Sequence, residues 1–314
     1  MPFPETWGLA LSYAQKIAED QGTERIVLFT PSKQQLKTTT LAQTLGPVVA
    51  KSLTDNRRTS LNGRFTLENK TLQTGRFALP QSVVIACYAN EKMMEHLDGL
   101  KGLVGVVAVP YIRDAADVWQ KRWNAHVHGA ARQAQPAPLI EDRVVAAALT
   151  SLTILVNVSH GILHPRDKQS ADMILRILRA KGHELDPVSI KSWAIRNGWD
   201  PKGGEDLAKL AARIAGLKGT PSLTKFNDPA ALYARWQSRP PNSPESSAPF
   251  QLVLRPRRRA GAPLCILILE EHAGRRAPGQ VAYSGNKALL KFLYRTAHRA
   301  SAYLGRRLQR RLSP

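Results

Sequence analysis

The stretch that decides the fold of the second half of the chain is residues 183–204, which read HELDPVSIKSWAIRNGWDPKGG. Asp186 and Asp200 each precede a proline, so each can accept hydrogen bonds from the first free amides of a helix. The proline then occupies the first helical position, where no amide partner is needed. Apolar side chains recur at helical spacing between the two signals and end at Gly198, which suits a left-handed helix stop. The stretch therefore predicts two helix starts with a short helix between them.

The same helical spacing extends to both sides of this stretch. The segment Arg143–Val158 is apolar nearly all round, but a bilayer span needs about twenty apolar residues, so we expect a buried central helix. Further helices are predicted over residues 171–178 and 207–214, and another over residues 225–236 that starts at Asp228. Together these patterns predict an all-α helical bundle.

A helix-turn-helix DNA reader is an alternative for this bundle. Its contacts to DNA would come from Lys191, Arg196, Lys202 and Lys209. Several aspartates and glutamates dilute the positive charge of the segment, and short helices with Asp-Pro corners are common scaffolds. The plain helical scaffold is the favoured interpretation.

Short apolar runs alternate with helical patterns in the first part of the chain. Three apolar runs are each followed by a helical pattern: Arg25–Thr30, Val83–Tyr88 and Leu103–Val109. Runs that are apolar on both faces and alternate with helices indicate a sheet covered on both sides. We therefore predict an α/β fold with a small parallel or mixed sheet, in a Rossmann-like three-layer arrangement.

Two further features are expected inside this sheet region. Residues 48–53 are a possible extra strand, and residues 34–45 have the pattern of one helix. A hairpin is expected within residues 57–79, because Asn62 and Gly63 form a turn signal between apolar positions.

Composition sets the expected boundaries of the domains. Residues 126–138 are rich in Ala, Gln, Gly and Pro, and residues 239–249 contain four prolines and three serines. The predicted organisation is an α/β domain at 1–125, a linker at 126–141, a helical bundle at 142–236, a Pro/Ser/Arg-rich linker at 237–262, and a strand plus a basic amphipathic helix at 263–314.

Positive charge is concentrated at the end of the chain. Residues 251–314 carry 14 Lys and Arg against two Glu, which is +12 of the net +21. One cluster consists of Arg255, Arg257, Arg258 and Arg259. A helical stripe follows at a four-residue step, skipped once at Tyr303, and consists of Lys287, Lys291, Arg295, Arg299, Arg306 and Arg310.

Such a basic amphipathic helix fits several partners. It can contact nucleic-acid phosphates, an anionic membrane surface or an acidic protein partner, or it can dock its apolar side on its own domain. Because the arginine cluster adds a second basic site, a polyanion is favoured. The predicted function is a cytoplasmic, non-catalytic binding or regulatory protein that contacts nucleic acid non-specifically through this tail.

The alternative function is a nucleotide- or phosphate-binding protein or enzyme. Ligands of an open parallel sheet bind outside the carboxyl ends of its strands. That rule selects Thr30, Ser32, Lys33, Tyr88, Asn90 and Arg113. Amides at the helix start after Ser32 could bind an anion. Neither a phosphate-binding P-loop nor a glycine-rich dinucleotide turn is present, and the sequence identifies no cofactor, catalytic residue or substrate.

Isolated histidines, tryptophans and cysteines carry weaker signals. His160, His164 and Asp167 have a spacing that occurs among metal ligands, but Pro165 interrupts the helix, so we predict no metal site. His160 is expected to cap the end of the buried helix, and Asp167 to start the next one. Trp119 and Trp123 lie one helical turn apart and are expected to pack in the core rather than to stack on a base.

The two cysteines and the N-terminus bear on the compartment. Both cysteines lie in apolar runs and are expected to be buried thiols in a reducing compartment. No signal peptide or transmembrane segment is expected, and the expected compartment is the cytoplasm.

Overall fold

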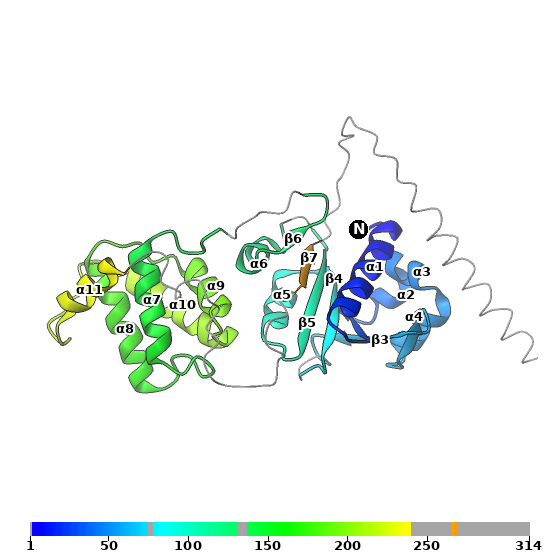
Figure 1. The fold of residues 1–314 in the computed structure, drawn as a ribbon, viewed down its shortest axis with the longest axis horizontal. Helices are drawn as coiled ribbons and strands as arrows, with labels where there is room; N and C mark the ends of the chain where they lie inside the picture. Colours follow the sequence, from blue (N-terminus) through cyan, green and yellow to red (C-terminus); the bar gives the residue numbers. More distant parts are fainter. Residues whose placement is uncertain (1, 75–77, 113, 131–136, 240–264, 269–314) are drawn as a thin grey trace, which may run out of the picture. The chain divides into compact units, whose positions relative to one another are not determined.

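The computed structural model describes residues 2–74, 78–112, 114–130, 137–239 and 265–268 (Figure 1). Within these residues the chain forms an α/β region with a mixed sheet, followed by a region whose regular elements are all helices. The sheet region contains α1 (Pro4–Asp20), β1 (Arg25–Thr30), α2 (Gln35–Thr38), α3 (Thr40–Leu45), α4 (Pro47–Thr54), β2 (Thr59–Leu61), β3 (Phe65–Thr71), β4 (Ser82–Ala89), α5 (Glu91–Asp98), β5 (Leu103–Pro110), α6 (Asp117–Trp123), β6 (His126–Val127) and β7 (Cys265–Ile268). The helical region contains α7 (Arg143–Leu155), α8 (Pro165–Ala180), α9 (Pro187–Arg196), α10 (Pro201–Ala215) and α11 (Pro229–Ser238).

The three strands expected from the apolar runs are present as β1, β4 and β5, at the centre of the sheet. Over the described residues the strand order is β2-β3-β1-β4-β5-β7-β6. Only the β2–β3 pair is antiparallel, so the sheet is mixed. β3 and β4 lie on opposite sides of β1, and the chain therefore reverses its direction of travel across the sheet at β1.

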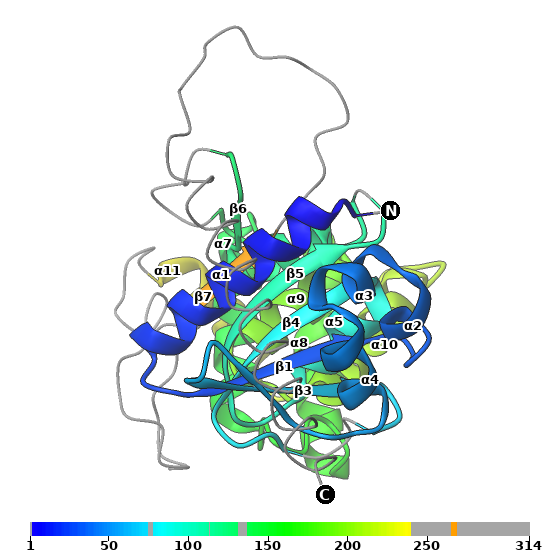
Figure 2. The ribbon, with the colours of Figure 1, turned by 90° about the vertical axis from the view of Figure 1, so that its right-hand side faces the viewer.

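Helices cover both faces of the sheet, as Figures 1 and 2 show. On one face, apolar side chains of α1 and of α2–α4 share a buried core with the strands, and Trp7, Leu36 and Leu53 belong to it. On the other face, α5 and α6 supply Met93, Leu97 and Trp119 to a second core. A strand that is buried on both faces favours apolar side chains on both of them, which explains the apolar run that follows Ser82 in β4.

The predicted hairpin is confirmed. β2 and β3 are antiparallel, and the turn between them has Asn62 at φ 55° and Gly63 at φ 75°. Two consecutive residues with positive φ are the signature of the type I′ turn, whose twist matches that of paired strands. The second strand of the hairpin then pairs in parallel with β1, a partnership that the turn signal does not predict.

Two local predictions in this region were wrong. Residues 48–53 form helix α4 rather than a strand, because Pro47 takes its first helical position after Gly46 and the buried side chains follow helical spacing. The helix expected over residues 34–45 is divided into α2 and α3 by Thr39, whose backbone is extended at φ −113° and ψ 171°. Three consecutive threonines at residues 38–40, which are β-branched and poor helix formers, explain the break.

The helical region has a core of its own, formed by α7 to α11. The Asp-Pro signals are confirmed as helix starts. Asp186 accepts from the amides of the second and third residues of α9, and Asp200 accepts from the amide of Lys202. Asp228 accepts from the amide of Ala231 at the start of α11. Because each cap lies next to the helix that it starts, these three helix starts could be predicted from the sequence.

The central apolar helix is shorter and less enclosed than expected. α7 ends at Leu155 instead of residue 158, and its last turn leaves Ile154 54% and Leu155 61% exposed. None of the helices in the described part of the chain combines the length and the apolar character that crossing a membrane requires.

Two strands come from segments that composition did not place in the sheet. β6 lies in the stretch predicted as a linker, and β7 lies beyond the Pro/Ser/Arg-rich segment. β7 pairs in parallel with both β5 and β6, so residues far apart in sequence complete this edge of the sheet. In β4, Cys87 is a buried free thiol, as expected, and burial raises its pKa.

Candidate functional site

Polar side chains meet at the carboxyl ends of β1 and β3. Thr30, the last residue of β1, is fully buried, and its hydroxyl donates to Oδ1 of Asn69 in β3 over 3.0 Å. Because side chains alternate along a strand, both lie on the sheet face that α1 covers, in line with Leu28 and Leu67 of the core on that face. The two strands thus share a buried polar contact where the core would otherwise be apolar.

Tyr88 joins the same face through a bulge in β4. Cys87 pairs with Val109 and Ala89 pairs with Pro110, so Tyr88 is an extra residue in β4. Its φ of 55° lies in the left-handed region. A bulge re-aims a side chain, and Tyr88 accordingly packs in the core beside α1 together with Cys87.

The backbone of Tyr88 is strained. The other residues with positive φ in the described part of the chain are Asn, Asp or Gly. A bulky residue held in this conformation costs on the order of 1–3 kcal/mol and persists only where the surroundings enforce it. Its ring is 5.0 Å from that of Trp7 and 6.4 Å from that of Tyr111, between centroids.

Two polar atoms of this cluster lack hydrogen-bond partners. Among the described residues, three buried side-chain atoms are unpaired: Asn69 Nδ2, Tyr88 OH and Arg122 Nε. The first two belong to residues near the carboxyl ends of β3 and β4, the strands on either side of β1, and these residues are only 5% and 4% exposed. Such atoms are rare in native proteins, and each calls for an explanation.

The remaining predicted strand-end residues have mostly structural roles. The amide and hydroxyl of Ser32 both donate to Oε1 of Gln35, at 3.0 and 2.8 Å, so in this structure both groups have a partner within the chain. Asn90 caps α5 by accepting from the amide of Met93 over 2.9 Å. Lys33 is partly buried after β1, and Arg113 lies outside the described residues.

Asn69 is a residue of this polar cluster that the sequence patterns did not identify. Buried and partly exposed positions alternate along β3, and Phe65, Leu67, Asn69 and Thr71 are the buried ones. An asparagine in the inward register of an alternating strand is the signal that could have identified it.

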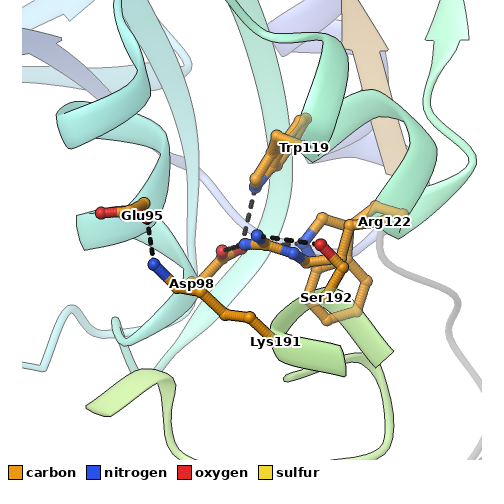
Figure 3. Close-up of polar contacts among 7 residues, drawn as sticks. Glu95, Asp98, Trp119, Arg122, Lys191 and Ser192 are labelled. Carbon is orange, nitrogen blue, oxygen red and sulfur yellow. Dashed lines mark hydrogen bonds and ion pairs between the residues drawn. The ribbon is translucent and has the colours of Figure 1, made fainter. Parts of the chain in front are cut away.

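A second polar cluster, drawn in Figure 3, connects α5 and α6. Oδ1 of Asp98 accepts from the indole nitrogens of Trp119 and Trp123 at 2.8 and 2.7 Å, and Oδ2 forms an ion pair with Arg122. The side chains of Asp98 and Arg122 are 1% and 3% exposed. Burial raises the pKa of Asp98, while Arg122 and the two indoles oppose that rise.

This cluster extends to α9. Arg122 donates to the hydroxyl of Ser192 over 3.4 Å, and Lys191 forms an ion pair with Glu95 (Figure 3). Trp119 is buried in the core, and Trp123 packs against it. The pair of tryptophans therefore serves packing and the Asp98 cluster, in agreement with the expectation that they pack in the core.

Three of the four cations that a helix-turn-helix reader would use form ion pairs within the protein. Lys191 pairs with Glu95, Lys202 with Asp206 at 3.5 Å, and Lys209 with Glu205 at 2.6 Å. Arg196 is half-buried, and burial lowers its pKa. These pairs weaken the DNA-reading interpretation of the helical region.

The start of α8 differs from the prediction. His164, not Asp167, is the N-cap of α8, and its Nδ1 accepts from the amide of Arg166 over 3.3 Å. His160 lies in the turn beyond α7, whose C-cap is Val156. Within the described ranges, no three His, Cys, Asp or Glu side chains are grouped so that they could hold a metal ion.

The basic residues predicted to bind nucleic acid lie outside the described residues. They are the arginine cluster Arg255, Arg257, Arg258 and Arg259 and the stripe Lys287, Lys291, Arg295, Arg299, Arg306 and Arg310.

One comparison with known proteins finds a match. Residues 141–237 match the model of a family described as a domain of unknown function (DUF1889). The match coincides with α7–α11, the helices that share one core. No curated protein matches the chain. No solved structure matches it either.

Proposed function

We propose that this chain is a cytoplasmic, non-catalytic binding or regulatory protein that contacts nucleic acid through its basic C-terminal tail, without strong sequence preference. The observation that carries the proposal is the charge distribution. Residues 251–314 hold +12 of the net +21, which leaves +9 for the first 250 residues. Clustered positive charge attracts polyanions, and a helical stripe presents it to a phosphate backbone.

The ion pairs of the helical region support the tail as the contact. Lys202 and Lys209 have carboxylate partners in the same helix and Lys191 pairs with Glu95 of α5, so their charge is partly balanced within the protein. Only two acidic residues, Glu270 and Glu271, accompany the 14 cations of residues 251–314. Phosphate contacts position a protein without reading sequence, so we expect similar affinity for unrelated sequences.

The test compares the full chain with two variants of equal net charge. The tail variant replaces Lys287, Lys291, Arg295, Arg299, Arg306 and Arg310 with Gln. The matched control replaces six exposed cations of the sheet region with Gln: Lys16, Lys51, Arg57, Lys92, Lys101 and Lys121. Both variants lose six positive charges, so only the position of the lost charge differs between them.

Binding to duplex and single-stranded DNA and to RNA is measured between 50 and 200 mM salt, where the slope is about 0.9 per phosphate neutralised for a duplex and about 0.7 for a single strand. Five or six contacts to a duplex predict a loss of affinity on the order of a thousandfold over this range. The tail variant should bind weakly and with a shallow slope, while the control should stay close to the wild type.

Two results would contradict the proposal. Equal loss of binding in both variants would mean that total charge, not the tail, provides the affinity. Tail-dependent binding to vesicles with anionic lipids, without binding to DNA or RNA, would assign the tail to a membrane surface.

A further inference from the structure

Buried polar side chains concentrate on one part of the sheet. Eight buried residues of the described chain are polar or charged. Three of them, Thr30, Asn69 and Thr71, lie at the carboxyl ends of β1 and β3, on the face that α1 covers. The Tyr88 hydroxyl adds a fourth polar group to the same core. A core that needed only stability would fill these inward positions with apolar side chains.

Two of these groups are destabilising as they stand. A buried donor or acceptor without a partner costs about 1–3 kcal/mol, and Asn69 Nδ2 and Tyr88 OH are both in this state. The strained backbone of Tyr88 adds a further cost. Strain and unpaired polar atoms that coincide at one place are typical of a binding site.

The topology of the sheet selects the same place. β3 lies on one side of β1 and β4 on the other. The helices that follow β1 pack on the α1 face, whereas α5, which follows β4, packs on the opposite face. Chain connections thus diverge at the carboxyl ends of β1 and β4, which is where ligands of open α/β sheets bind.

The local charge indicates the sign of a ligand. Residues 31–54, which follow β1, contain three lysines and no Asp or Glu. Lys33 comes three residues after Thr30, and it is partly buried. Asn69 Nδ2 can only donate a hydrogen bond, and the Tyr88 hydroxyl can donate one as well. Such donors, together with the lysines of the segment that follows β1, match anionic oxygen atoms.

We infer that the carboxyl ends of β1, β3 and β4 form a binding site for a small molecule with phosphate oxygens. Asn69 and Tyr88 donate to these oxygens, and Lys33 balances their charge. Both donor atoms are shielded from water in the unliganded protein, so the ligand enters through a local opening. The ring of Tyr111 contacts the Tyr88 ring edge-on and is 56% exposed. Tyr111 is therefore the solvent-exposed side chain that lies over Tyr88.

Replacing Tyr88 with Phe separates a binding role from a structural one. Tyr88→Phe removes only the hydroxyl, which has no partner in the protein, so the melting temperature of the unliganded variant should stay unchanged or rise. The matched control is Tyr13→Phe, because the Tyr13 hydroxyl belongs to α1 and is hydrogen-bonded at 3.0 Å to His128, which follows β6 and not β1, β3 or β4. Lys33→Ala is the second site variant.

The probes are inorganic phosphate and AMP, each titrated while thermal unfolding of the full chain is followed. A ligand that binds only the folded protein raises its melting temperature in a concentration-dependent way. We expect this rise for the wild type and for Tyr13→Phe. Loss of one hydrogen bond to a charged group should weaken binding to Tyr88→Phe roughly 10- to 100-fold, and Lys33→Ala should also bind more weakly.

The tail variant described above separates this site from the basic tail. Because the inferred site lies in the sheet, the tail variant should keep the full ligand response even if it no longer binds nucleic acid. Stabilisation by both probes would assign recognition to the phosphate group, and stabilisation by AMP alone would assign it to a phosphate ester. The inference fails if neither probe stabilises the wild type, or if Tyr88→Phe and Lys33→Ala respond as the wild type does.

Discussion

Asp98 is the residue whose loss should damage the fold most. Its carboxylate accepts from two indoles and pairs with Arg122, and both charged side chains are almost completely buried. Asp98→Ala would leave a buried guanidinium without its counter-charge, which costs about 3–5 kcal/mol of unfolding free energy. Denaturant unfolding followed by circular dichroism measures this loss.

A surface ion pair provides the control for that prediction. Glu19 and Arg64 are 2.7 Å apart, but their side chains are 48% and 58% exposed. Glu19→Ala should therefore cost no more than about 1 kcal/mol. If Asp98→Ala is as mild as Glu19→Ala, the buried pair does not stabilise the fold in the way its burial implies.

The distance in sequence between partners explains which residue roles could be predicted. Asp186, Asp200 and Asp228 cap helices that begin at the next residue, so the signal is local and readable. Thr30 and Asn69 are 39 residues apart, and Arg122 and Asp98 are 24 apart. Neither pair has a spacing that indicates contact until the strands and helices are placed.

At the level of elements, the cap of α9 makes the stability of the helical region depend on pH. Burial raises the pKa of Asp186, but hydrogen bonds from Ser189 and from the amide of Val188 outweigh it, and the net pKa is lowered. A lowered pKa means that the carboxylate stabilises the folded state above its unfolded-state pKa of about 3.9. This stabilisation is lost as the pH falls through the lower folded-state value.

Two substitutions of Asp186 test this dependence. Asp186→Ala removes the cap and should cost about 1 kcal/mol at neutral pH. Asp186→Asn keeps an acceptor for the amides but cannot titrate, so its difference from the wild type should shrink as the pH falls from about 5 to about 2. Urea unfolding across that range gives the measurement. A constant difference between Asp186→Asn and the wild type would show that the charge of the cap does not contribute.

Helices, strands and turns could be predicted where a single local sequence pattern determined the structure. Continuous apolar runs identified β1, β4 and β5, and the Asn-Gly signal identified the β2–β3 turn. Residues 48–53 were misread because a short apolar run fits a buried strand and a buried helix equally well. The proline at position 47 was the signal that favours a helix there.

For the whole molecule, strand order could not be predicted from patterns along the chain. Patterns identify strands but not their neighbours, and β7 is separated by more than a hundred residues from β5, with which it pairs. The binding site inferred at the strand ends depends on the same information, because β3 had to be placed beside β1 before Asn69 could meet Thr30. The sequence patterns therefore selected the same edge of the sheet as the inferred site, but only some of the residues that the inference uses.

The position of β7 leads to a prediction about truncated chains. A chain that ends at Pro249 lacks β7, which leaves β5 unpaired along one edge and separates β6 from the sheet. A chain that ends at Glu271 keeps β7 and matches the compact unit Met1–Glu271. Unpaired amides and carbonyls on an apolar edge strand are unfavourable and promote association between chains.

The shorter chain should therefore melt at a lower temperature and associate at lower protein concentration than the chain ending at Glu271. Thermal unfolding and light scattering measure the two effects, and hydrogen exchange of the β5 amides locates them. Both chains lack the six-residue basic stripe, so the comparison is independent of nucleic-acid binding by that stripe. Equal melting temperatures and equal protection of β5 would mean that β7 contributes nothing to the sheet, and that residues 1–249 fold without it.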